Sequence, residues 1–206
     1  MRLITFGDSW TAGHGVEQNI LYKEDPTPPL FIEKLREQNS WPRWTANKLS
    51  IPFVNISKCG WGNEYIYNSV EETLPFIKKD DIIVVVFSYP YRYERYNEYT
   101  PLELFNRFEE LLDGYNKFYF NGFYPLLNDV DEKVKFPKHY INPQGTLSYI
   151  LQVEEIQNKK DVWEYGSKSV WNDEQNYYEG DYHPNLEGYK IIGNYIYSEL
   201  KPFLNA

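Results

Sequence analysis

The chain has 206 residues and a single cysteine, Cys59, so no disulfide can form within it. Positive charge is also scarce, because 21 Lys and Arg stand against 30 Asp and Glu, and the formal net charge is −9. Binding to phosphate needs clustered Lys and Arg, so we expect neither nucleic acid nor a membrane as a partner. The longest uninterrupted apolar run, IIVVVF at 82–87, is too short to cross a bilayer.

The sequence offers no secretion signal either, because the first strand pattern starts at Arg2. Together with the lone cysteine, this predicts a cytoplasmic protein, although export by another route and incorporation in a phage particle stay open. There is no metal-ligand cluster, Walker loop or dinucleotide fingerprint, and the G-x-G triplets at 13–15 and 60–62 are isolated. We therefore expect no metal and no cofactor. The oligomeric state has no signal in the sequence.

Aromatic residues are what the chain has in abundance, at 18% of the sequence, with 20 tyrosines and 6 tryptophans. Their rings fill a core while a polar tip stays in water, and they also line clefts that bind sugars. Hydrophobic residues make up 42%, which excludes a disordered composition. The length fits one domain over residues 1–206.

Strand and helix patterns alternate along the chain, and Thr100 and Glu103 form a capping box at the start of one helix. This alternation predicts βαβ units and hence a three-layer α/β/α sandwich around a parallel sheet. Segments 16–40 and 126–178 are interpreted as insertions, the second with a helix-like stretch at 148–165. Strands are expected at 3–6, 51–57, 81–88 and 116–125, and helices at 41–50, 64–77, 100–114 and 183–204.

Binding sites of parallel sheets lie beyond the carboxyl ends of the strands, which here means loops 7–15, 58–63 and 88–95 and the loop before the last helix. The first of these loops begins GDSW, so Asp8 and Ser9 follow the first strand on a glycine-bounded turn. One interpretation is an ordinary strand end in which Asp8 caps local backbone. The other is that Ser9 is presented as a nucleophile.

A hydrolytic serine needs a base, a group that orients the base, and donors for the oxyanion. His183 lies in GDYHPN, with Asp181 two residues before it. A carboxylate at that place can accept from the imidazole Nδ1–H and leave Nε2 facing the serine. We interpret His14 as a loop residue and His139 as a surface residue. Arg92 is either a solvated charge or a ligand for a substrate carboxylate or an oxyanion.

Three segments together carry a resemblance to a known family: GDSW at 7–10, Gly60 within NISKCGWGN, and DYHPN at 181–185. They resemble the GDSL/SGNH hydrolases. The resemblance implies a flavodoxin-like α/β/α sandwich and hydrolysis of esters through an acyl-serine.

Residue roles follow from the same resemblance. Ser9 is implied as the nucleophile, and its own N–H as one oxyanion donor. Gly60 matches the glycine of the family's second block, whose N–H is another donor. Asp181 and His183 are implied as the rest of the catalytic triad.

The third block of the family departs from its usual form in this chain. The family has G-x-N-D after the third strand, with the Asn side chain as an oxyanion donor, whereas this strand continues into FSYPYRYER. The Asn position falls near Pro90, which has no N–H to donate. Asn63, Ser88 and Arg92 are the candidates for additional oxyanion or substrate contacts.

The acid also sits at an unusual spacing. The family often has D-x-x-H, and Gly180 occupies that acid position here. The D-x-H spacing of this chain points to Asp181, with Glu179 as the second candidate.

Together, these observations and the resemblance predict a serine esterase that hydrolyses a small acyl ester, such as an acetyl group on a carbohydrate. Its expected partner is a small-molecule or glycan ester. One alternative is a catalytically impaired protein of the same fold that binds carbohydrate or serves a structural role. A further alternative is a sugar O-acyltransferase, which uses the same triad but excludes water better.

Overall fold

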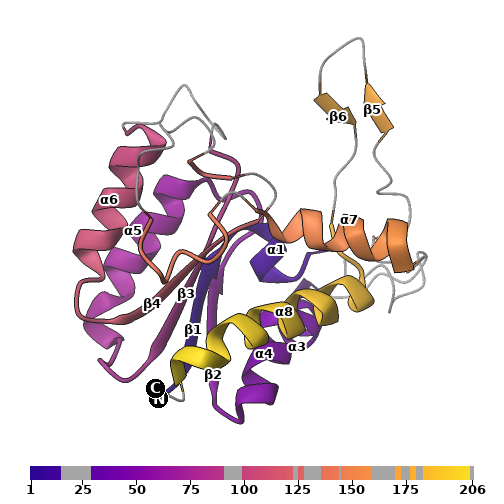
Figure 1. Cartoon of the computed structure of the whole chain (residues 1–206). Helices are drawn as coiled ribbons and strands as arrows, with labels where there is room; N and C mark the ends of the chain where they lie inside the picture. Colours follow the sequence, from indigo (N-terminus) through magenta and orange to yellow (C-terminus); the bar gives the residue numbers. More distant parts are fainter. Residues whose placement is uncertain are drawn as a thin grey trace.

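A computed structural model describes residues 1–14, 29–90, 99–122, 125–127, 136–143, 145–158, 170–172, 177–179 and 183–204. Parallel strands form the middle of the molecule, and helices cover both faces (Figure 1). The strands are β1 (Leu3–Gly7), β2 (Phe53–Ser57), β3 (Ile82–Phe87), β4 (Asn116–Asn121), β5 (Val170–Asn172) and β6 (Tyr177–Glu179). The helices are α1 (Ser9–Ala12), α3 (Pro29–Asn39), α4 (Trp41–Leu49), α5 (Asn63–Thr73), the 3₁₀ helix η1 (Leu74–Phe76), α6 (Pro101–Leu111), α7 (Leu147–Asn158) and α8 (Leu186–Leu204).

The main sheet has the order β2-β1-β3-β4, and all its pairings are parallel. This confirms the predicted α/β/α sandwich with a flavodoxin-like sheet. Every residue of β3 is fully buried, which explains its unbroken apolar run, because both faces of a central parallel strand are covered. Beyond β4 the next sheet position is held by a single parallel bridge between Tyr119 and Tyr140.

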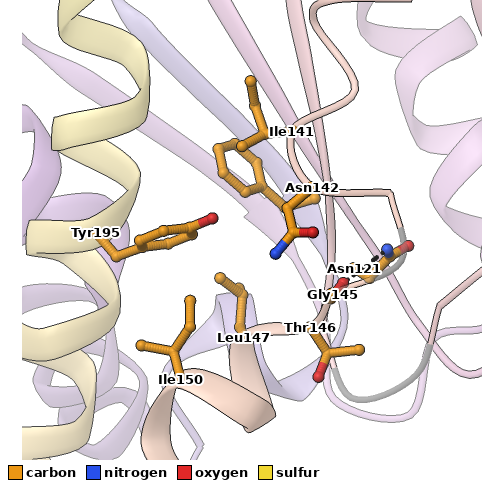
Figure 2. A pocket seen from close by; sticks show the side chains of 9 residues that line it. Asn121, Ile141, Asn142, Gly145, Thr146, Leu147, Ile150 and Tyr195 are labelled. Atoms are coloured by element: carbon orange, nitrogen blue, oxygen red, sulfur yellow. Dashed lines mark hydrogen bonds between the residues drawn. The ribbon is translucent and has the colours of Figure 1, made fainter. Parts of the chain in front are cut away.

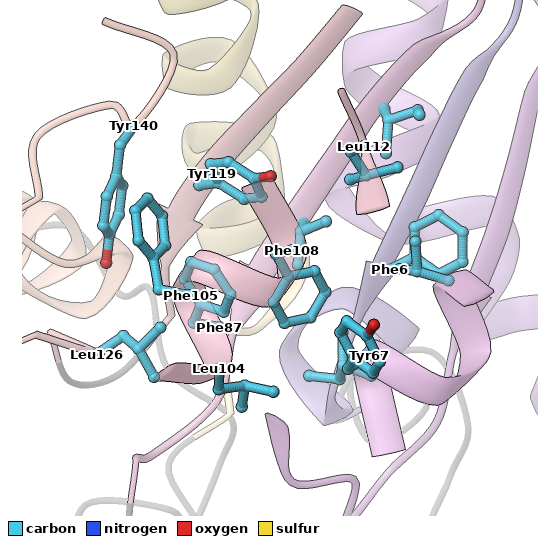
Figure 3. Packing of buried hydrophobic residues seen from close by; sticks show 14 of the residues in the cluster. Phe6, Tyr67, Phe87, Leu104, Phe105, Phe108, Leu112, Tyr119, Leu126 and Tyr140 are labelled. Carbon is cyan, nitrogen blue, oxygen red and sulfur yellow. The ribbon is translucent and has the colours of Figure 1, made fainter. Parts of the chain in front are cut away.

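Two hydrophobic clusters occupy the two faces of the sheet. Alternate residues of β3 divide between them, since Ile82, Val84 and Val86 belong to one cluster and Ile83, Val85 and Phe87 to the other. The first cluster is completed by α4, α7 and α8, and the second by α5 and α6. The second is rich in aromatic rings (Figure 3), and Phe87 stacks on Tyr119 with ring centroids 5.5 Å apart. Most of the abundant aromatics described here therefore serve the core.

Local sequence signals set most helix ends. The predicted capping box is present, because the Thr100 hydroxyl accepts from the Glu103 N–H and the Glu103 carboxylate accepts from the Thr100 N–H. The helix expected at 64–77 is α5 followed by η1, where Pro75 cannot donate to the preceding turn. The last helix starts at Leu186, later than expected, since Asn185 caps it by accepting from the Gly188 N–H.

In the two predicted insertions, α7 corresponds to the helix-like stretch expected at 148–165, whereas α3 and the pair β5 and β6 are not predicted from the sequence. Segment 16–40 includes α3, and its residues 16–28 lie outside the described part of the chain. Segment 126–178 includes α7, which ends at Asn158, and the antiparallel hairpin of β5 and β6 (Figure 1). Within the described residues, no helix is both long and apolar enough to cross a membrane. The expected cytoplasmic location stays a prediction.

A buried carboxylate fixes the amino-terminal edge of the sheet. Asp81 is fully buried just before β3, and it accepts from the backbone N–H groups of Arg2 and Lys78 and from the Arg2 guanidinium at 2.6 Å. Burial alone raises the pKa of Asp81, but the hydrogen bonds from Arg2 and Lys78 outweigh it and leave that pKa below its ordinary value. The start of β1 is thereby tied to the start of β3.

We expect Asp81→Asn to lower the free energy of unfolding by about 2 kcal/mol, because it removes a charged acceptor from buried donors. The neighbouring Asp80, whose side chain is 63% exposed, provides the matched control, and Asp80→Asn is expected to change stability by less than about 0.5 kcal/mol. Urea denaturation of both variants measures the difference. Equal effects would contradict the role assigned to Asp81.

The lowered pKa of Asp81 also sets a pH dependence. Its contribution is fully present above the ordinary carboxyl pKa of about 4 and is lost as the pH falls through the lower folded-state value. The stability gap between wild type and Asp81→Asn should therefore be widest above about pH 4 and narrow at lower pH.

Candidate functional site

The turn after β1 presents Ser9 at the carboxyl end of the sheet. The Asp8 side chain caps α1 by accepting from the Trp10 N–H at 3.0 Å, and Ser9 is the first residue of that short helix. A Cβ on Gly7 would collide with the Thr11 side chain, so the turn requires glycine there. Gly13 ends the helix with φ +84°, a left-handed conformation that favours glycine. The geometry of the turn therefore explains both glycines, whether or not Ser9 is a nucleophile.

Three loops are joined beneath this turn by buried hydrogen bonds. Asp8 Oδ2 accepts from Ser88 Oγ at 2.7 Å, which links the ends of β1 and β3. The Ser88 N–H donates to Asn63 Oδ1 at 2.7 Å, and Asn63 Nδ2 donates to the Ser88 carbonyl at 3.1 Å. Asn63 starts α5, so the loop after β2 joins the network. We call Asp8, Ser88 and Asn63 the loop-end network.

The loop-end network bears on two residues considered as oxyanion or substrate contacts. Both Asn63 and Ser88 are buried, with exposed fractions of 6% and 1%, and they form hydrogen bonds with each other and, from Ser88, with Asp8. The other residue of that set, Arg92, lies outside the described residues. Gly60 is exposed in the loop after β2 with φ +85°, which explains why glycine stands there.

His183 reaches the Ser9 turn from the other end of the chain. It is 3% exposed, just before α8, and its Nε2 lies 3.2 Å from Nδ1 of His14 with the ring centroids 4.2 Å apart. The His14 N–H donates to the Ser9 carbonyl at 3.0 Å. The His14 carbonyl accepts from the Tyr189 hydroxyl at 2.8 Å. His14 therefore links the candidate base to the turn that carries the candidate nucleophile.

The structure does not describe the candidate acids. Asp181 and Gly180 lie outside the described residues, and Glu179 is described only as the end of β6. The sequence predicts His14 to be an ordinary loop residue, and its contact with His183 is not predicted. Its only local signal is its place between two glycines, which does not reveal a partner 169 residues away.

The third histidine, His139, lies beside β4, where its carbonyl accepts from the Tyr119 N–H. Its Nε2 lies 2.8 Å from the Glu109 carboxylate, which also pairs with Lys117. Burial raises the pKa of Glu109, but the bonds from His139 and Lys117 leave it below its ordinary value. The side chain is 28% exposed, so His139 is half-buried and hydrogen-bonded to Glu109 rather than a plain surface residue. Among the described residues, no group of three potential ligands could hold a metal.

Two small pockets lie near the carboxyl ends of the strands. One is bounded by β4, α7 and α8, and Tyr195 points toward Asn142 across it (Figure 2). It encloses about 170 Å³, partly open to solvent, with room for about one water molecule. The other has about 230 Å³ and is lined by the residues Asn63, Glu64, Pro90, Tyr99, Pro101, Leu104 and Leu126. Each has room for only about one water molecule, so neither matches a typical ligand site of roughly 300–1,000 Å³.

We expect Asn63→Ala to lower the free energy of unfolding by about 2–3 kcal/mol, because it leaves the buried N–H and carbonyl of Ser88 unpaired. Ser88→Ala removes only a hydroxyl and is expected to cost about 1 kcal/mol. Asn116→Ala is the control, since its side-chain bond to Lys79 is exposed, and less than about 0.5 kcal/mol is expected. Chemical denaturation ranks the three variants, and a loss for Asn63→Ala no larger than that for Asn116→Ala would refute the network.

Comparisons with protein-family models and with curated proteins found no match. Solved structures do match over nearly the whole chain. Phospholipase A1 from Streptomyces albidoflavus NA297 aligns with a TM-score of 0.53 at 11% identity, over 98% of each chain. A family two carbohydrate esterase from Clostridium thermocellum, in complex with cellohexaose, aligns with a TM-score of 0.52 at 17% identity. That match covers 99% of this chain and 64% of the esterase, so this chain spans less than two thirds of it.

A third match is a protein described as a GDSL-like lipase from Parabacteroides merdae ATCC 43184, with a TM-score of 0.50 at 12% identity. It covers 97% of this chain and 95% of that protein. These likenesses confirm the resemblance at the level of the fold: the chain has the α/β/α fold of the GDSL/SGNH hydrolases.

Proposed function

We propose that this chain, which has the SGNH-hydrolase fold, is a serine esterase. Ser9 is the nucleophile, His183 is its base, and Asp181 orients the base. The observation that carries the proposal is the half-buried contact of His183 with the Ser9 turn through His14. A histidine near the carboxyl-terminal end of the chain has no packing need for a polar partner there, whereas a base must reach its nucleophile.

The reaction then follows from the chemistry of these groups. His183 Nε2 takes the proton of the Ser9 hydroxyl while Oγ bonds to the ester carbonyl carbon. The N–H groups of Ser9 and Gly60 donate to the resulting oxyanion. Collapse breaks the bond to the alcohol, which leaves with the proton from His183. Water, deprotonated by His183, then attacks the acyl-serine, and the acid is released with Ser9 restored.

The loop-end network stabilises the loops that carry this site. We assign Asn63 and Ser88 the task of holding the three loop ends in register, because their polar groups bond to each other and to Asp8. Pro90 supplies no donor, so the oxyanion depends on the backbone N–H groups of Ser9 and Gly60, one donor fewer than in the family pattern. Loss of one donor lowers a rate by roughly 10²–10³, so we expect a slow esterase.

A small acyl ester, such as acetyl on a carbohydrate, is the substrate class we propose. Two exposed tyrosines support it: Tyr65 in the first turn of α5 is 61% exposed and Tyr89 just after β3 is 43% exposed. Both lie beside loops at the carboxyl ends of the sheet, where rings can stack on a sugar. The cellohexaose complex of the carbohydrate esterase with the same fold agrees with this choice.

We expect a fluorophosphonate probe to add once to the wild-type protein, as measured by intact-protein mass. Ser9→Ala should give no adduct, and His183→Ala should react about 10³-fold more slowly, because the serine then lacks its base. His139→Ala removes a histidine that lies beside β4 instead, and its rate should match wild type.

Circular dichroism of each variant confirms that it is folded. No adduct on folded wild type would sink the esterase proposal and favour the impaired, carbohydrate-binding alternative. An adduct that survives in Ser9→Ala would show that another residue is the nucleophile.

A further inference from the structure

We propose that His14 is a positioning residue of the esterase, which holds the His183 ring at Nε2 until the ester arrives. The inference rests on the proposed function. It starts from the contact between the two rings, with Nδ1 of His14 and Nε2 of His183 3.2 Å apart. The nitrogen of His183 that must act as the base is thus the atom that His14 engages.

The backbone of His14 is fixed on both sides, which allows its ring to position another group. Its N–H donates to the Ser9 carbonyl at 3.0 Å, and its carbonyl accepts from the Tyr189 hydroxyl at 2.8 Å. Tyr189 is fully buried in the first turn of α8, and His183 stands three residues before that helix. His14 is therefore contacted at two points, at its carbonyl by Tyr189 of α8 and at its ring by His183 just before that helix.

The direction of the bond follows from the triad. If Asp181 accepts the Nδ1–H of His183, neutral His183 carries its lone pair on Nε2, so His14 is the donor through its own Nδ1–H. That nitrogen has a single lone pair in the ring plane, and the bond from His14 stands in for the bond from the Ser9 hydroxyl. At 3.2 Å it lies at the long end of the normal range, so it is easily exchanged.

The same bond is lost once His183 is protonated. The imidazolium carries a proton on Nε2, and His14 also presents a proton, so the two donors cannot bond to each other. The His183 proton is then free to pass to the leaving alcohol. His14 in this account guides the ring before the proton transfer and does not itself take a proton from the substrate.

Two substitutions separate a hydrogen-bonding role from a packing role. His14→Phe keeps an aromatic ring against His183 but has no donor, and His14→Asn keeps an amide N–H near the position of Nδ1. We expect His14→Phe to lower the rate of phosphonylation by the fluorophosphonate and the kcat for p-nitrophenyl acetate by about 10–100-fold. KM should change by less than about 3-fold, and His14→Asn should restore at least about a third of the rate.

The outcomes divide clearly. Wild-type rates in His14→Phe, or equal losses in both variants, would overturn the role of His14 and leave the esterase proposal standing. A rate that stays near wild type in His14→Phe but falls in His14→Asn would assign His14 a packing role and would also overturn the inference. A wild-type protein that never reacts with the probe defeats the esterase proposal itself, before any His14 variant is compared.

A second test of the hydrogen bond between the two rings is spectroscopic and needs no turnover. In ¹⁵N NMR of the folded proteins, the His183 Nε2 resonance should move in His14→Phe and return toward its wild-type position in His14→Asn. An unchanged His183 resonance in both variants would show that no hydrogen bond joins the two rings.

Discussion

The buried carboxylate of Asp8 is the point on which the arrangement of the site depends. It binds the backbone of its own turn through Trp10 and the hydroxyl of Ser88 from the neighbouring strand. Ser88 in turn pairs its backbone with Asn63. A buried carboxylate is stable only when its oxygens find donors, so the turn after β1 and the loops after β2 and β3 must come together. Ser9 is placed by this requirement before any chemistry is considered.

The second constraint is the meeting of the first and last parts of the chain. The α8 helix packs on the sheet beside α4, and its buried apolar face fixes where its amino-terminal end lies. That end brings His183 and Tyr189 to His14, five residues after Ser9. The packing of the core therefore brings the two ends of the chain together, and the hydrogen bonds of His14 with His183 and Tyr189 fix their positions.

Much of this could be predicted from the sequence, because it rests on local patterns. The apolar run of β3, the capping box at Thr100 and the glycine-bounded turn at Ser9 are each encoded within a few residues. What could not be predicted depends on distant partners: the pairing of His14 with His183, and that of Asn63 with Ser88. The segment that pairs with the outer edge of β4 could not be predicted either, because a single bridge at Tyr140 leaves no strand pattern in the sequence. Helix α3 was missed because its charged residues mask a weak apolar stripe.

In the proposed reaction, Ser9 carries the acyl group during turnover. The most direct measurement is peptide mapping by mass spectrometry after acid quenching of the protein during hydrolysis of p-nitrophenyl acetate. We expect one acetyl group on the peptide that contains Ser9, present during turnover and absent once the ester is consumed. An acetyl group found elsewhere, or ester hydrolysis without any acetylated Ser9, would contradict it.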